Sequence, residues 1–138
     1  ATRQAENAIG QGNVLMSPLA MAMVAAAVQS GRPIDPSLVV AEARTPGPAL
    51  PSATAAALQD MMRAVVTSGT GTLLAALPGQ VAGKTGTAEY GTDVPPRSHS
   101  WFVGYRGDLA FAVFVADGAS AGVPAAPIAQ TFLTAVPL

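Results

Sequence analysis

The 138-residue sequence contains no cysteine, a single histidine, His99, and a single lysine, Lys84. Without cysteine the chain can form no disulfide bond and has no thiolate for catalysis or metal binding. One histidine cannot form a His-rich metal site, and we expect no metal and no other cofactor. A net charge of −1 gives no basic surface of the kind that binds nucleic acid, so we expect no nucleic-acid partner.

Charged residues make up only 11% of the sequence, whereas half of it is apolar. No apolar run reaches the roughly 18 residues that span a bilayer, and the longest is the alanine-rich stretch from Pro18 to Val28. The apolar excess indicates either a well-buried core or an apolar surface that a further segment covers. The length suits one compact domain. The stretch from Ala1 to Glu6 begins without methionine and has no signal-peptide pattern, so we expect a processed or excised piece.

The spacing of apolar residues predicts three helices, over residues 19–29, 52–68 and 128–135. Ser17 and Ser52 are the expected N-caps of the first two, with Pro18 in the first turn. Gly31 and Gly69 are the expected helix stops. In the third helix the larger apolar residues are expected to face inward, namely Ile128, Phe132 and Leu133.

Four short segments are β-prone, namely residues 38–41, 84–90, 100–105 and 109–116. Only short loops, at 92–97 and 106–108, separate the last three, so these strands are expected to form an antiparallel meander. Residues 10–13 and 45–51 are predicted to be loops. The order of helix, short strand, helix, three strands and helix predicts an α+β fold and not a doubly wound parallel sheet.

The segment Gly83-Lys84-Thr85 first suggests a phosphate-binding P-loop. That motif needs four residues between its first glycine and the Gly-Lys pair, and here only three separate Gly79 from Gly83. A P-loop lysine also opens a helix. The residues after Lys84 include two glycines and two prolines by Pro96, which makes a poor helix start, so the sequence strongly disfavours the nucleotide-binding interpretation.

A strand interpretation of the same segment gives it a different chemistry. Alternation places Lys84 and Gly86 on one face and Thr85 and Thr87 on the other. One ammonium and two hydroxyls on a strand form a small patch that binds anions, while Gly86 leaves room for a substrate backbone to lie close. An edge strand can also receive a peptide as an added strand. Lys-Thr-Gly alone is a short match, and a plain exposed turn is the alternative.

Other segments occur in the order found in the penicillin-binding transpeptidases. Gly10-Gln11-Gly12 followed by Ser17-Pro18-Leu19-Ala20-Met21-Ala22 resembles their GQG…(T/S)PLQMA stretch. Lys84-Thr85-Gly86-Thr87-Ala88-Glu89 matches their substrate-binding strand, and residues 99–105, HSWFVGY, resemble the strand beside it. The sequence from 1 to 138 is thus similar to the C-terminal portion of the transpeptidase domain of a class B penicillin-binding protein. The resemblance implies a partial β-lactamase/transpeptidase-like fold, with three strands of a five-stranded sheet.

The resemblance also implies roles for particular residues. Lys84 is expected to be the electrostatic and proton-relay residue, and Thr87 to give a backbone N–H to the oxyanion. Thr85, Gly86 and Thr87 are expected to bind the substrate, with the two hydroxyls on its carboxylate. The side chains of the neighbouring strand are expected to be structural, namely His99, Trp101 and Tyr105.

The implied activity is peptidoglycan D,D-transpeptidation through a serine acyl-enzyme. The expected ligands are muropeptides ending in D-Ala-D-Ala and the β-lactams that mimic them. The implied partners are the missing N-terminal half of the same domain and proteins of cell division or elongation. The implied location is the extracytoplasmic face of the cell membrane, with an N-terminal anchor that lies outside this chain.

Two further motifs of the family are absent from the sequence. Ser-x-x-Lys, which holds the nucleophile, is impossible because Val81 stands three positions before the single lysine. Ser-x-Asn is absent because Ala5 and Gln11 stand two positions before the asparagines, Asn7 and Asn13. We therefore expect a transpeptidase fragment that is inactive alone. The alternatives are a non-catalytic binding or interaction module on the same scaffold and a metal- or nucleotide-dependent enzyme of another fold, which the residue inventory nearly excludes.

Overall fold

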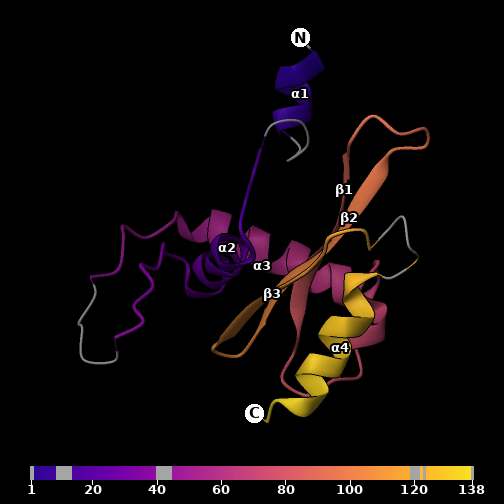
Figure 1. Ribbon diagram of the computed structural model, residues 1–138. Coiled ribbons are helices and arrows are strands. Elements are labelled where there is room, and N and C mark those ends of the chain that lie inside the picture. Colours follow the sequence, from indigo (N-terminus) through magenta and orange to yellow (C-terminus); the bar gives the residue numbers. More distant parts are fainter. Residues whose placement is uncertain (1, 9–13, 40–44, 119–121, 123, 138) are drawn as a thin grey trace.

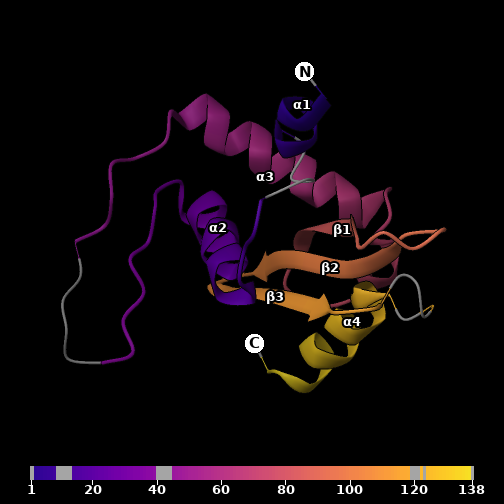
Figure 2. The same ribbon diagram turned by 45° about the horizontal axis from the view of Figure 1, so that its top comes forward.

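The computed structural model describes residues 2–8, 14–39, 45–118, 122 and 124–137. Its elements are α1 (Thr2–Ala8), α2 (Pro18–Ser30), α3 (Ser52–Thr67), the 3₁₀ turn η1 (Thr72–Leu74), β1 (Ala82–Tyr90), β2 (Arg97–Arg106), β3 (Leu109–Val115) and α4 (Ala125–Ala135). The strands form one antiparallel sheet in the order β1-β2-β3. Helices α2 and α4 lie on opposite faces of this sheet and α3 lies beside β1 (Figures 1 and 2). The α+β fold with a three-stranded meander is confirmed.

Helix α2 begins and ends where its sequence predicts. The Ser17 hydroxyl accepts a hydrogen bond from the Ala20 N–H at 3.1 Å, and Pro18 occupies the first turn, where its missing N–H costs nothing. Gly31 ends the helix with a φ of 69°, a conformation that glycine adopts without strain. The side buried against the sheet carries Ala25 and Val28, and their small size lets α2 approach closely.

Two local expectations need correction. Pro51, not Ser52, is the N-cap of α3, because its carbonyl already accepts hydrogen bonds from the Thr54 and Ala55 N–H groups. Leu38 and Val39 form a bend and no strand, because no other described segment pairs with them and Leu38 is 99% exposed. Val40 and Ala41 lie outside the described residues, as does the loop expected at 10–13.

The core lies between the sheet, α4 and the end of α3. Its largest fully buried side chains are Phe102, Leu74, Leu133, Val66 and Val81. Helix α4 begins three residues earlier than expected and meets the sheet through Ala125, Ala126, Ala129 and Leu133. The inward orientation expected for Ile128 and Phe132 is wrong, since they are 41% and 40% exposed. The alanines bring the helix close to the sheet, which leaves the two larger side chains at its edge, beside Phe111 and Val113.

Candidate active-site strand

The predicted substrate-binding residues lie on β1, at one edge of the sheet. Antiparallel pairing sets Lys84 opposite Val103, Thr85 opposite Phe102, Gly86 opposite Trp101 and Thr87 opposite Ser100. Lys84 and Gly86 therefore share one face and Thr85 and Thr87 the other, as the alternation predicts. Among the described residues β1 pairs with β2 alone. Its other edge pairs with no described strand and is called the open edge below (Figure 1).

Two glycines bring β1 and β2 together just before the polar segment. A Cβ on Gly83 would lie 2.6 Å from Phe102 Cζ, and a Cβ on Gly104 would lie 2.4 Å from the Ala82 carbonyl oxygen. Real side chains do not tolerate such distances, so only glycine fits at both positions. The ring of Phe102 fills the space that the two glycines leave. Because this ring is buried, it fixes the position of β1 beside β2 at Lys84 and Thr85.

The main-chain groups of β1 point alternately toward β2 and away from it. The Ala82 carbonyl lies against Gly104 of β2. The carbonyls of Val81 and Thr85 instead accept hydrogen bonds from side chains, from Arg63 Nη1 at 2.5 Å and from Lys84 Nζ at 2.6 Å. Since alternate residues of a strand direct both N–H and C=O to the same edge, Thr87 directs its N–H to the open edge with Thr85.

Thr85 has a second polar neighbour that sequence reasoning missed. Its hydroxyl oxygen lies 2.6 Å from that of Thr70, in the loop that follows α3. Thr70 belongs to the Thr70-Gly71-Thr72 passage, where the glycine between two threonines predicts only a turn before the strand. The two residues are fifteen positions apart, and nothing in the local pattern of either one signals the contact.

The residues expected to be structural form an aromatic row on the Lys84 face of the sheet. The ring of His99 stacks on Tyr90 with centroids 4.0 Å apart and meets the edge of Phe114 at 5.0 Å. Trp101 packs on the same Phe114 at 4.5 Å. Tyr90 also donates a hydrogen bond to Asp117, which raises the pKa of the tyrosine, with a smaller raising effect of burial. These contacts support a packing role for His99 and Trp101.

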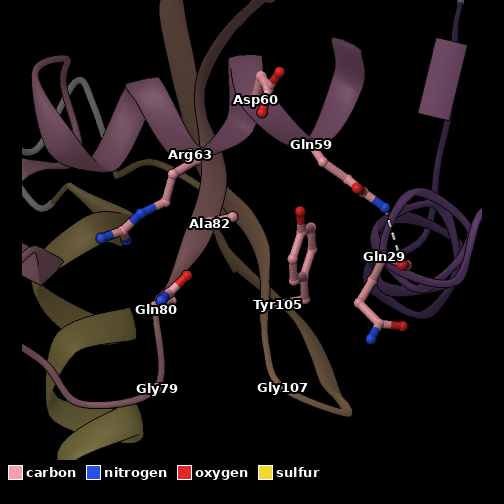
Figure 3. Close-up of a pocket in the computed structure, with 9 residues that line it drawn as sticks. All are labelled: Gln29, Gln59, Asp60, Arg63, Gly79, Gln80, Ala82, Tyr105 and Gly107. Atoms are coloured by element: carbon pink, nitrogen blue, oxygen red, sulfur yellow. Dashed lines mark hydrogen bonds between the residues drawn. The ribbon is translucent and has the colours of Figure 1, made fainter. Parts of the chain in front are cut away.

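A cavity of about 570 Å³ is lined by Ala82 of β1 and by residues of α2, α3 and β2. Figure 3 shows it between α3, α2 and the start of the sheet, with Asp60, Gln59 and Tyr105 around it. Gln59 spans from α3 to α2, where it donates to the carbonyls of Val28 at 2.9 Å and Gln29 at 3.1 Å. Burial raises the pKa of Tyr105, and the charge of Asp60 raises it further. The cavity is lined by none of the predicted substrate-binding residues.

The described part of the chain contains no group of three His, Asp or Glu residues that could hold a metal ion. Its helices include none that is both long and apolar enough to cross a membrane.

Comparison with known proteins places the strand in a family context. Residues 2–134 match the penicillin-binding protein transpeptidase domain family. The peptidoglycan D,D-transpeptidase PbpA of Mycolicibacterium smegmatis is 35% identical, over 94% of this chain and 31% of that protein. PbpA of Mycobacterium tuberculosis is 33% identical, over 92% of this chain and 30% of that protein. The crystal structure of PBPA from Mycobacterium tuberculosis superposes with a TM-score of 0.66 at 31% identity, covering 94% of this chain and 34% of that one.

The chain thus spans about a third of the length of the curated relatives that it matches.

Proposed function

We propose that this chain, which belongs to the penicillin-binding protein transpeptidase family, supplies one wall of a peptidoglycan D,D-transpeptidase site. The observation that carries the proposal is the open edge of β1, where Lys84, Thr85 and Thr87 lie together. A stem peptide that ends in D-Ala-D-Ala docks along this edge as an added strand. Its free carboxylate accepts hydrogen bonds from the hydroxyls of Thr85 and Thr87, and Gly86 leaves room for its backbone.

The reaction is an acyl transfer in two steps. A serine oxygen attacks the carbonyl of the penultimate D-alanine, the peptide C–N bond breaks, and the terminal D-alanine leaves with the proton on its amine. The amine of a neighbouring stem peptide then attacks the ester, which forms the cross-link and returns the serine hydroxyl. The N–H of Thr87, directed to the open edge, stabilises the developing oxyanion, and Lys84 keeps the site electropositive.

The nucleophile comes from another part of the protein. The single lysine of this chain has no serine three positions before it, so the Ser-x-x-Lys motif must lie elsewhere. The relatives, about three times as long, have room for it. The remaining elements of the proposal follow from the family as well: β-lactams as ligands, an extracytoplasmic location, a membrane anchor in another segment, and partners in cell division or elongation.

Labelling with a fluorescent penicillin tests the proposal. The isolated chain is expected to form no covalent adduct, whereas the protein that joins it to a Ser-x-x-Lys segment is expected to be labelled. Lys84→Ala in that protein is expected to slow labelling by about 10²-fold or more, because it removes a group that moves a proton or stabilises charge. Arg32→Ala, an exposed cation on the loop after α2, is the control and is expected to label normally.

Undiminished labelling of Lys84→Ala would exclude the role given to Lys84. If no segment of the protein carries Ser-x-x-Lys and no penicillin is bound, the chain is a non-catalytic binding module on the transpeptidase scaffold.

A further inference from the structure

We propose that Thr70 is a positioning residue that orients the Thr85 hydroxyl toward the carboxylate of a bound ligand. This inference rests on the proposed function, because Thr85 is the residue through which Thr70 acts. The observation behind it is the distance of 2.6 Å between the two hydroxyl oxygens, which is at the short end of the range for hydrogen bonds between hydroxyls. Either hydroxyl can be the donor.

The loop that carries Thr70 is fixed to its surroundings on both sides of that residue. The Ser68 and Gly71 N–H groups donate to the carbonyls of Ala64 and Val65, each at 2.9 Å, which ties the loop to the last turn of α3. A Cβ on Gly69 would lie 2.9 Å from the Val65 backbone, so the loop rests directly on the helix. A mobile loop could not hold a hydroxyl at one place, and these contacts remove that mobility.

The ring of Phe102 contacts both the loop that carries Thr70 and the strand that carries Thr85. Phe102 is fully buried, is the cross-strand partner of Thr85, and has its Cε2 atom 3.4 Å from the Cβ position of Gly71. The loop and β1 are thus packed on opposite sides of one rigid side chain. The Thr70–Thr85 contact is therefore set by the core, independently of any ligand.

The direction of the hydrogen bond decides what Thr85 offers to a ligand. A hydroxyl has one hydrogen and two acceptor lone pairs. When Thr85 donates to Thr70, only lone pairs face the open edge, and they repel a carboxylate. When Thr70 donates to Thr85, the hydrogen of Thr85 is available to the ligand, and the two hydrogen bonds polarise each other in a chain from Thr70 to Thr85 to the carboxylate.

A carboxylate, which only accepts, selects the second arrangement. An ester or amide at the same place carries no charge and gains less from the aligned donor. Removing the Thr70 hydroxyl leaves the Thr85 hydroxyl without its donor, free to rotate about its own bond. Thr70 therefore contributes to the preference for ligands with a free carboxylate and contributes little to ligands without one.

The first experiment measures acylation of the protein that joins this chain to its Ser-x-x-Lys segment, with benzylpenicillin and with its methyl ester. Thr70→Val, which keeps the shape and removes the hydroxyl, is expected to lower the second-order rate constant for benzylpenicillin about 3- to 12-fold, the upper part of the range for the loss of one neutral hydrogen bond. The rate constant for the ester is expected to change by less than about 2-fold. Thr70→Ser restores the hydroxyl and is expected to recover most of the rate. Thr72→Val, an exposed threonine in the adjoining turn, is the matched control.

The second experiment needs no acylation. Binding of N-acetyl-D-alanyl-D-alanine and of its C-terminal amide to this 138-residue chain is followed by NMR, through the Thr85 amide and methyl signals. The wild-type chain is expected to prefer the acid, and Thr70→Val is expected to lose that preference while Thr70→Ser retains it. If the acid is preferred but the longer protein is never acylated, the proposed function fails and the role of Thr70 stands.

Three results would overturn the role of Thr70: equal loss of rate with both penicillins, no loss with either, or no preference of the wild-type chain for the acid. Equal loss means that Thr70 only supports the fold of β1.

Discussion

Arg106 offers the sharpest test of how this chain holds its last helix against the sheet. It stands at the end of β2 and is 3% exposed. Its guanidinium donates from Nη1 to the Leu133 carbonyl and from Nη2 to the Val136 carbonyl, each at 2.7 Å. Both acceptors lie at the C-terminal end of α4, where carbonyls lack partners within the helix and where the helix dipole favours a positive charge.

The perturbation is Arg106→Met, which keeps most of the apolar stem and removes the charge. Two hydrogen bonds from a charged donor contribute about 1.5–3 kcal/mol each, so their loss alone amounts to about 3–6 kcal/mol. Two effects reduce this sum. Methionine needs no desolvation of a buried cation, and the substitution also removes the buried Nε, which has no partner among the described residues. The expected net loss is about 2–3 kcal/mol in the free energy of unfolding.

Urea unfolding followed by circular dichroism measures this loss. Arg106→Lys keeps the charge but reaches one carbonyl at a time, and it is expected to lose about half as much. Arg32→Met, at an exposed position, is the control and is expected to change stability by no more than about 0.5 kcal/mol. An Arg106→Met protein as stable as this control would refute the reasoning, because it would mean that the α4 carbonyls find other partners at no cost.

Two further predictions concern the glycines of β1 and the pH dependence of stability. Gly83→Ala places a Cβ 2.6 Å from Phe102 Cζ and is expected to lower the free energy of unfolding in urea by about 1–3 kcal/mol. Gly86→Ala places its Cβ 3.3 Å from Trp101 Cβ, so it is expected to retain most of the stability and to slow penicillin acylation of the longer protein. Equal losses of stability in the two variants would contradict this prediction. Burial, with the Asp60 charge, raises the pKa of Tyr105 above 10.0, so its contribution to stability is present below pH 10.0 and lost as pH rises through the folded pKa. Tyr105→Phe should reduce the stability loss in alkali, and an unchanged pH dependence would contradict it.

The strands were predictable because their residues carry a local signal. Alternation and short turns give β1, β2 and β3 to within three residues at each end, and Ser17 and Gly31 bound α2 through their own backbone chemistry. Such signals need no knowledge of the rest of the chain. The Lys-Thr-Gly segment was likewise placed correctly on a strand, because a helix cannot follow it.

The features that the sequence did not predict have a different cause, because tertiary packing determines them. Ile128 and Phe132 lie at the edge of α4 because the small alanines of the helix meet the sheet first. Leu38 is apolar and β-prone, yet it forms no strand without a partner to pair with. Thr70 is close to Thr85 only because α3, Phe102 and β1 hold both in place. None of these outcomes is encoded in the spacing of neighbouring residues.

The polar composition of part of β1 supports the peptide-binding role that we propose for it. From Lys84 to Thr87 its side chains are polar or absent, so this stretch gains little from burial and is held instead from its start, by the buried Val81, by Arg63 and by the contact of Gly83 with Phe102. An exposed edge strand is a hazard in most proteins, because it can pair with another chain. In the site that we propose, that invitation is selective. The proposed ligand ends in a carboxylate that engages the threonine hydroxyls, and its backbone passes Gly86, where the missing side chain leaves room.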